Sequence, residues 1–202
     1  MARIEPLPSD AVGDLAPLLE QVREAMGFVP NSMLTMARVP GLAPALSALT
    51  RVIWGPGRVD PAIKGLAAIM ASRGAECRYC QAHTAHRAHG QLGVEQAKLD
   101  ALWSFETADL FSAAERAVLR VAFGAGQAPN GVTDADFAAL RTHFDDDQVA
   151  ELVAMISLFG FLNRWNDTLA TELEASPLAF GEASLTPLGW DAGKHGSGTP
   201  ST

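Results

Sequence analysis

Apolar residues recur along most of this chain with the 3.6-residue period of an amphipathic helix. No convincing segment alternates between apolar and polar residues with the period of two that a half-buried strand shows. The pattern predicts an all-α fold. The expected helices cover residues 9–26, 30–39, 41–53, 60–72, 77 to 90 or 93, 94–103, 113–124, 133–143 and 147–174.

Local start signals support several of these boundaries. Asp60-Pro61 combines a favourable N-cap with proline at the first helical position. Ser112 and Glu115 have the spacing of a capping box. The acidic run at 145–147 places negative charge at the start of the last long helix, where the helix dipole favours it.

The length and composition of the chain bound its domain organisation. It has 202 residues, of which 48% are hydrophobic, which supports one helical domain over residues 1–175 or two tightly packed helical halves. A faint internal repeat agrees with two pseudo-repeated halves, since the helix from Asp60 into the cysteines aligns with the helix from Asp146. Residues 176–202 are rich in Gly, Ser, Thr and Pro, and we expect an extended or disordered arm there.

The charge of the chain disfavours several classes of partner. The net charge is −8 and no basic stripe is present, so neither nucleic acid nor an anionic membrane surface is expected as a partner. No apolar run approaches the roughly 20 residues of a membrane-spanning helix. The N-terminal segment lacks the charged and then apolar pattern of a secretory signal. We therefore expect a cytoplasmic protein.

The two cysteines, Cys77 and Cys80, are the most informative residues. A disulfide that closes so short a loop gains little chain entropy, and in a reducing cytosol such a pair is more often catalytic or metal-binding. Both lie near the first turn of a predicted helix, where unpaired N–H groups and the helix dipole favour a thiolate. Residues three apart on a helix are neighbours, so one sulfur can attack a sulfenic acid on the other. The competing interpretation is that both are small buried hydrophobes.

Histidines follow the cysteines at the same spacing. His83 lies three residues after Cys80 and can exchange a proton with it, whereas His86 and His89 are rotated further around the helix and fit a surface or interface role. Cys77 and His83 are about 9 Å apart along the helix axis. Zinc bonds are only about 2.0–2.3 Å long, so this helix alone does not build a zinc site. We expect no metal and no organic cofactor.

Four further polar residues are candidates for the pocket or for a proton relay. Glu76 and Tyr79 flank the cysteines, and Tyr79 is placed to cover the site. Asn163 and Asp167 interrupt the apolar stripe of the last long helix, where buried polar groups need partners. They form either a hydrogen-bonded helix junction, a subunit contact or part of the lining of the cysteine pocket.

Three segments resemble the AhpD-like, carboxymuconolactone-decarboxylase-related superfamily, and two of them resemble its peroxidase-related branch in particular. They are the cysteine motif at residues 76–83, the segment at 159–167 that contains Asn163, and the turn at 26–31 before the second predicted helix. The resemblance spans residues 10–175.

The resemblance implies an AhpD-like helical bundle assembled as a homo-oligomer, a trimer or a hexamer. It also implies reduction of a small-molecule hydroperoxide by the cysteine pair, which a separate thiol reductant then restores. By match to the motif, Cys80 would attack the peroxide and become a sulfenic acid, and Cys77 would resolve it to a disulfide. His83 would belong to the proton relay.

The chain departs from the family pattern at two positions. The best-known members place the relay histidine four residues after the second cysteine, where this chain has Thr84, so His83 is one residue early; both spacings keep the same helical face. The same members carry a glutamate twelve residues before the first cysteine, where this chain has Gly65. Glu76, Asp167 or an acid from another subunit would have to replace it.

These features together predict a thiol-dependent peroxidase or disulfide reductase, an antioxidant oxidoreductase with a redox-active disulfide between Cys77 and Cys80. Two alternatives stay open. The superfamily's name suggests a lactone-decarboxylase-like enzyme, although a redox pair has no obvious purpose in proton-transfer chemistry. The glycine at position 65 favours a non-catalytic, redox-sensing helical assembly protein.

Overall fold

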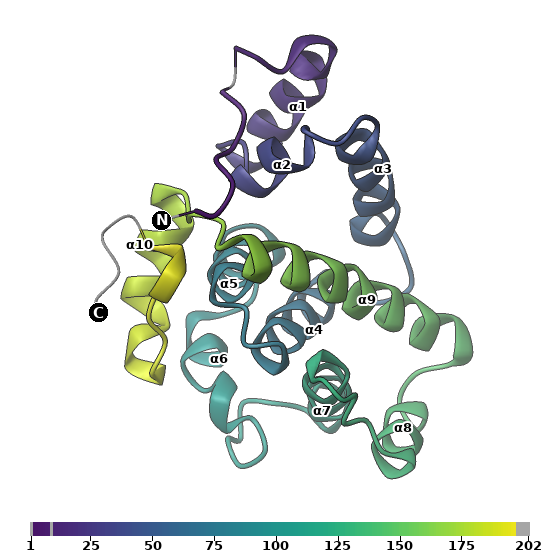
Figure 1. The fold of residues 1–202 in the computed structure, drawn as a ribbon. Helices are drawn as coiled ribbons and strands as arrows, with labels where there is room; N and C mark the ends of the chain where they lie inside the picture. The colour runs from purple at the N-terminus through teal and green to yellow at the C-terminus, as the bar shows by residue number, and fades with distance from the viewer. Residues whose placement is uncertain (1, 9, 197–202) are drawn as a thin grey trace.

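The computed structural model describes residues 2–8 and 10–196, and over these residues it is helical without any strand (Figure 1). The all-α prediction is therefore confirmed. The helices are α1 (Ala16–Met26), α2 (Asn31–Met36), α3 (Leu42–Trp54), α4 (Pro61–Gly74), α5 (Arg78–Leu92), α6 (Gln96–Asp100), α7 (Ala113–Gly126), α8 (Asp134–Arg141), α9 (Asp146–Leu169) and α10 (Ala175–Ser184).

The capping residues set the starts of the helices. Ser112, Thr133 and Asp145 each form a capping box at the start of α7, α8 and α9. Asp60 accepts a hydrogen bond from the backbone N–H of Ala62 at 2.7 Å at the start of α4. Because each cap satisfies backbone N–H groups that have no partner inside the helix, these short sequence signals are enough to place the helix ends.

Three predicted boundaries are wrong for identifiable reasons. The first helix begins at Ala16, after a 3-10 turn that starts at Gly13 with φ 54°, rather than at residue 9. The segment 94–103 is divided into α6 and a 3-10 turn. The last long helix ends at Leu169 rather than 174, because Ala170 takes the left-handed conformation with φ 49°.

The C-terminal segment is not an extended or disordered arm as far as it is described. Residues 175–196 form α10 and two 3-10 turns, and α10 packs against α5 (Figure 1). Leu185 and Trp190 from this segment are buried in the main core. A few large apolar side chains therefore anchor a segment whose composition lacks a helical pattern; residues 197–202 of the predicted arm lie outside the described residues.

The central helix of the bundle is α4, which packs against α5, α7 and α9 (Figure 1). Its residues from Lys64 to Ser72 are buried on every side. The ammonium group of Lys64 donates to the carbonyl oxygens of Ile53 at 3.0 Å and Gly55 at 3.2 Å and forms an ion pair with Glu151. A buried charge is tolerated only with such partners, and this one joins α3, α4 and α9.

The expected internal repeat stays a prediction. It aligns α4 and α5, which are two helices separated by a turn, with the single continuous helix α9.

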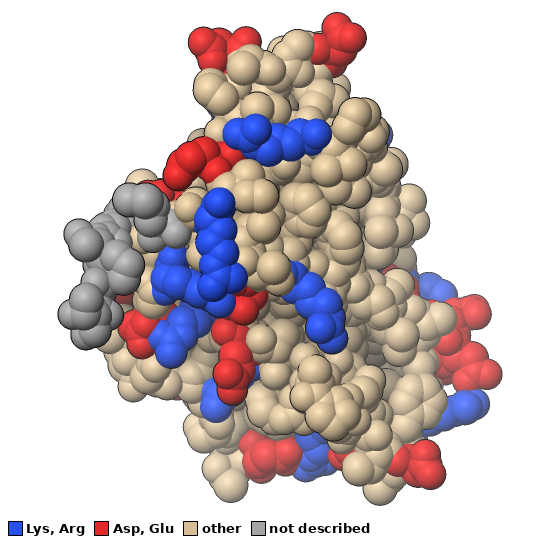
Figure 2. Space-filling model, viewed as in Figure 1, with Lys and Arg blue, Asp and Glu red and all other residues tan. Residues whose placement is uncertain are grey.

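Figure 2 shows basic side chains interspersed with acidic ones on one face, between large uncharged areas. Among the described helices, none has both the length and the apolar character that crossing a bilayer requires.

Two glycines allow α4 and α7 to approach each other closely. A Cβ atom added to Gly126 would overlap the carbonyl oxygen of Ala71, and one added to Gly74 would overlap that of Phe123. Backbone atoms cannot move aside as the end of a side chain can. The distance between α4 and α7, and with it the position of the turn that follows α4, therefore depends on these glycines.

We expect Gly126→Ala to lower the free energy of unfolding by about 1–3 kcal/mol, because the added methyl group overpacks the contact between α4 and α7. Gly160→Ala in α9 is the matched control, since a Cβ there meets nothing within 4 Å. It should leave stability unchanged or raise it by up to about 1 kcal/mol. Urea denaturation measures both, and equal stabilities for the two variants would contradict the packing argument.

Candidate functional site

The turn between α4 and α5 places the two cysteines. Glu76 has φ 56°, in the left-handed region that residues other than glycine rarely adopt, and the backbone N–H of Cys77 donates to the Ser72 carbonyl at 3.0 Å. Cys77 is the N-cap of α5, and its Sγ accepts a hydrogen bond from the backbone N–H of Cys80 at 3.4 Å. Both residues are free thiols, with exposures of 0% and 2%. The turn thus buries both sulfurs at the start of α5.

Cys80 lines an apolar cavity of about 170 Å³. The cavity lies between α1, α2, α3, α5 and α9, and its apolar lining includes Val22, Met26, Met33, Leu46, Trp54, Phe159 and Leu162. An engineered apolar cavity of about 150 Å³ holds benzene, so this one has room for a molecule the size of a small substituted ring. Four polar lining residues, His83 among them, come from α5, and the others are Ser32, Ser47, Thr50 and Asn166 from neighbouring helices.

His83 and Glu174 form a buried pair at this cavity. His83 Nε2 lies 2.5 Å from Glu174 Oε2, with side-chain exposures of 12% and 11%. Tyr79 donates its hydroxyl hydrogen to Glu174 Oε1 at 2.9 Å, and its ring stacks on His83 with ring centroids 4.3 Å apart. The backbone N–H of Asn31 also donates to this carboxylate. The imidazole is therefore held in one orientation by groups from three segments of the chain.

Burial and charge act in opposite directions on the pKa of Glu174. Burial alone would raise it, but the positive charge that His83 carries when protonated and the hydrogen bonds from His83 and the Asn31 backbone outweigh burial and lower the pKa below its usual value. Burial also raises the pKa of Tyr79 well above its usual value, and the charge of Glu174 adds to that effect. Glu174 is thus the ionised partner and Tyr79 the neutral donor.

The pKa of the Cys80 thiol is raised well above its usual value, first by burial and then by the neighbouring Cys77. The side-chain amide of Asn166, whose Nδ2 lies 3.6 Å from Cys80 Sγ, opposes this effect without cancelling it. The prediction that the helix N-terminus favours a thiolate is therefore wrong for the resting protein. Ionisation of Cys80 requires a base, and the base that shares its cavity is His83.

Glu174 is the site residue that the sequence analysis missed. The predicted helix to residue 174 placed it on the last turn of α9, whereas the chain leaves α9 at Ala170 and turns back toward α5. At Gly65, where the family pattern has a glutamate, an added Cβ would lie 2.9 Å from Leu92 Cδ1 and 3.2 Å from Ala88 Cβ. That position has no room for an acidic side chain, and residue 174 supplies the carboxylate instead.

Glu76 and Asn163 lie away from the cavity. Glu76 is exposed in the turn before α5 and lines a different surface hollow. Asn163 is buried and donates to the Ala71 carbonyl at 3.4 Å, so it joins α9 to α4, as the helix-junction interpretation has it. The α9 residue at the thiol is Asn166, one turn beyond the predicted position. Tyr79, by contrast, does line the cavity.

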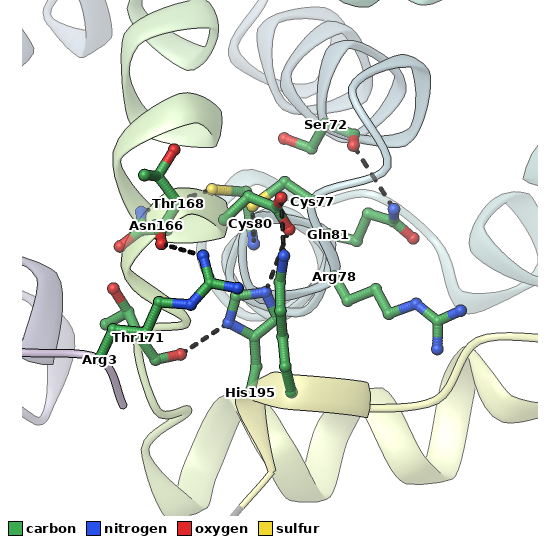
Figure 3. Close-up of polar contacts among 12 residues, drawn as sticks. Arg3, Ser72, Cys77, Arg78, Cys80, Gln81, Asn166, Thr168, Thr171 and His195 are labelled. Carbon is green, nitrogen blue, oxygen red and sulfur yellow. Dashed lines mark hydrogen bonds and ion pairs between the residues drawn. The ribbon is translucent and has the colours of Figure 1, made fainter. Parts of the chain in front are cut away.

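His195 from the C-terminal segment lies near Cys77 (Figure 3), and Asp167 belongs to the same group. Cys77 Sγ, a carboxylate oxygen of Asp167 and a ring nitrogen of His195 lie within 4.8 Å of one another. In the part of the chain that the structure describes, these three residues are the group with the donor types of a metal site. The ammonium of Lys194 already lies 2.8 Å from Asp167 Oδ2, so a metal cation would compete with it for this carboxylate.

We expect Glu174→Gln to lower the free energy of unfolding by about 1–3 kcal/mol at pH 7, because the ionised carboxylate accepts three hydrogen bonds that an amide cannot replace. The pKa of Glu174 is lower in the folded protein, so its stabilisation is complete above the ordinary value of 4.5 and is lost as the pH falls through the folded value. The difference between the two proteins should therefore shrink below pH 4.5.

Urea denaturation at a series of pH values measures this difference. Glu182→Gln is the matched control, since Glu182 is an exposed glutamate of α10 and its replacement should leave stability unchanged at every pH. A gap between wild type and Glu174→Gln that stays constant into acid would show that the carboxylate charge contributes nothing.

Comparison with known proteins agrees with this fold. The model of the carboxymuconolactone decarboxylase family matches residues 40–123. The uncharacterized protein YnjA of Escherichia coli strain K12 is 30% identical over 111 residues, which cover 55% of this chain and 60% of that protein. The match thus spans less than two thirds of that relative.

Solved structures extend the similarity to most of the chain. A cysteine-to-alanine variant of the debrominase Bmp8, in complex with 2,3,4-tribromopyrrole, is 31% identical with a TM-score of 0.83, over 89% of this chain and 96% of that one. A peroxidase-related protein with an alkylhydroperoxidase AhpD core, from Ralstonia eutropha JMP134, is 24% identical with a TM-score of 0.73, over 86% and 94%. At that identity the second similarity establishes the fold alone. The cysteine turn, the helical bundle and these matches together establish that the chain belongs to the AhpD-like, carboxymuconolactone decarboxylase superfamily.

Proposed function

We propose that this protein is a thiol-dependent peroxidase that reduces small apolar hydroperoxides with Cys77 and Cys80. The observation that carries the proposal is the apolar cavity that places Cys80 beside the His83–Glu174 pair. Buried thiols with raised pKa values are poor nucleophiles unless a base takes the proton as they react. The buried pair supplies that base and holds its orientation.

In the first step, the Cys80 thiol passes its proton to His83 and its sulfur attacks the terminal oxygen of the hydroperoxide. The S–O bond forms, the O–O bond breaks, and the departing alkoxide takes the proton back and leaves as an alcohol. The sulfur has lost two electrons and is a sulfenic acid. Glu174 stabilises the imidazolium while the proton is on His83.

In the second step, Cys77 attacks the sulfur of the sulfenic acid. The S–S bond forms and hydroxide leaves as water with the proton from the Cys77 thiol. A dithiol reductant of the cell then restores both thiols, so that one hydroperoxide and one dithiol give an alcohol, water and a disulfide. No metal or organic cofactor enters this cycle.

Reductive debromination is a second candidate, because the debrominase structure with tribromopyrrole shares 31% identity over most of this chain. A brominated ring has the size that the cavity admits. The same thiol pair would supply two electrons, so that the carbon–bromine bond is replaced by carbon–hydrogen and the products are bromide, a proton and the Cys77–Cys80 disulfide. Lactone decarboxylation receives less support, since a largely apolar lining suits a carboxylate substrate poorly.

We also propose that the protein assembles as a homo-oligomer, as the resemblance implies. Several large apolar side chains of α3 and α9 are exposed, namely Leu49, Val52, Val153 and Phe161, and Val52 reaches 77%. Exposed apolar groups of this kind suit contact with a second copy of the chain.

We expect Cys80→Ser to abolish hydroperoxide-dependent oxidation of a dithiol, because the attacking sulfur is gone. Cys77→Ser should still react once, and dimedone should then trap one sulfenic acid per chain without turnover. With wild type, kcat/KM for cumene hydroperoxide should exceed that for hydrogen peroxide by about tenfold or more, since the apolar ring is transferred into an apolar cavity.

The same variants distinguish the candidate functions when bromide release from 2,3,4-tribromopyrrole is measured beside peroxide turnover. Release that depends on Cys80, with no peroxide turnover, would favour the debrominase. A single oxidation by peroxide without turnover would identify a redox sensor. Full peroxidase activity in Cys80→Ser would sink the proposal.

For the assembly, we expect sedimentation velocity to give the mass of a trimer or a hexamer for wild type. Val52→Asp should shift the mass distribution toward the monomer, because it places a charge in the apolar contact. A compact wild-type monomer at micromolar concentration would contradict the proposed assembly.

A further inference from the structure

The second thiol of the pair has a histidine of its own. We propose that His195 accepts the proton of Cys77 when Cys77 attacks the oxidised Cys80, so that the C-terminal segment controls the resolving step. The proposal deepens the proposed function and rests on it for the identity of the oxidant. It assigns the two thiols to two separate bases, His83 for attack and His195 for resolution.

Hydrogen bonding sets the proton positions on His195. The Nδ1 atom lies 2.7 Å from the carbonyl oxygen of Thr171 (Figure 3). A carbonyl oxygen only accepts, so Nδ1 carries the hydrogen and Nε2 presents a free lone pair. The ring is fully buried, and Nε2 has no hydrogen-bond partner among the residues that the structure describes. An unpartnered basic nitrogen therefore lies in the group that contains Cys77 Sγ.

Asp167 makes this nitrogen ready to accept a proton. Its Oδ1 lies 3.5 Å from His195 Nε2, so two lone pairs face each other while the ring is neutral. Once Nε2 is protonated, the same contact becomes a charge-assisted hydrogen bond. Burial lowers the pKa of His195, although the Thr171 and Asp167 contacts partly oppose it, so the ring is neutral and available near pH 7.

Two hydrogen bonds anchor the segment that carries His195, one at His195 itself and one at Trp190. The backbone carbonyl of His195 accepts a hydrogen bond from the N–H of Leu173 at 2.8 Å, and Trp190 Nε1 donates to the carbonyl of Arg78 at 3.2 Å. The 3-10 turn Gly193–His195 packs against α5. This docking keeps the ring of His195 fully buried.

The reaction that His195 serves is balanced. The Cys77 thiol gives its proton to Nε2, the sulfur attacks Cys80, and the S–S bond forms as the group on Cys80 leaves with its electron pair. With a sulfenic acid this group is hydroxide, and the imidazolium proton converts it to water. Cys77 Sγ and the ring nitrogen lie within 4.8 Å of each other, a separation that a side-chain rotation or one bridging water molecule closes in the proposed step.

The titratable and charged groups around Cys77 and His195 come from three elements. From α5 they are Cys80, Tyr79 and Arg78, from α9 Asp167, and from the C-terminal segment Lys194 and Asp191. Arg78 forms an ion pair with Asp191, and Lys194 forms one with Asp167, so the remaining free base is His195. In the described structure, His83 is instead bonded to Glu174.

The test uses 2,2′-dipyridyl disulfide and the full chain. Attack by Cys80 releases one pyridine-2-thione and leaves a pyridyl disulfide on Cys80. Attack by Cys77 then forms the Cys77–Cys80 disulfide and releases the second thione. The two releases separate the two bases without any peroxide, and Cys77→Ser, which should show only the first, confirms the assignment.

His195→Asn is the informative variant, because its amide N–H replaces the donor to Thr171 and removes the basic nitrogen. We expect the first release to stay within about twofold of wild type and the second to slow by about 10²-fold or more. The pH profile of the second release should move toward the ordinary thiol pKa of about 8.5. His89→Asn is the matched control, since His89 Nδ1 also bonds a backbone carbonyl, that of Val94 at 3.2 Å, and both releases should be unchanged.

Asp167→Asn keeps the test decisive if His195→Asn does not fold, because Asp167 is half-exposed. In Asp167→Asn the second release of pyridine-2-thione should slow by about tenfold. An unchanged second release in either folded variant, or an equal slowing of both releases, would overturn the inference. If wild type does not turn over peroxide but its second thione release still depends on His195, the proposed function is refuted and the role of His195 is supported.

Discussion

The burial of α4 on all sides is the constraint on which the rest of this structure depends. Between Lys64 and Ser72 this helix, packed against α5, α7 and α9, has no solvent-facing side, so the buried cation Lys64 must be paired with Glu151 and backbone carbonyls. The same packing forces the chain to turn sharply when α4 ends. Glu76 accepts an unfavourable backbone conformation there, and the cysteines enter the core at the start of α5.

Burial of the cysteines has a chemical cost that the surrounding groups offset. A thiol without water around it ionises reluctantly, which is why the pKa of Cys80 is raised despite its place at a helix N-terminus. The protein surrounds the pair with basic groups held by carboxylates, His83 with Glu174 and His195 beside Asp167. His195 is as buried as the thiols and the His83 side chain is 12% exposed, so in the proposed reaction each charge that forms has its partner in place beforehand.

The position of Glu174 shows how a family site can keep its chemistry when the packing changes. The close contact between α4 and α5 at Gly65 leaves no volume for an acid at the position where the family pattern has one. The segment after α9 brings a carboxylate to the histidine from the other direction, and Asn31 and Tyr79 bind it there. The acidic partner of His83 is therefore identified by its contacts in the folded protein and not by its distance in sequence from the cysteines.

The sequence by itself determined the helical class, most helix starts and the juxtaposition of the two cysteines, because these depend on residues at most four positions apart. Apolar periodicity predicts each helix. Ser112 and Asp145 mark the starts of α7 and α9 through capping boxes with the residue three positions later, and Cys77 and Cys80 are neighbours on one turn. Only the tertiary structure brings Glu174 to His83 and His195 to Cys77. Glu174 is 91 residues from His83 in the sequence, and His195 reaches Cys77 at the start of α5 from the C-terminal segment. No local sequence pattern encodes contacts between residues so far apart. Burial, which sets the pKa of Cys80, is likewise a property of the packed molecule and not of the motif.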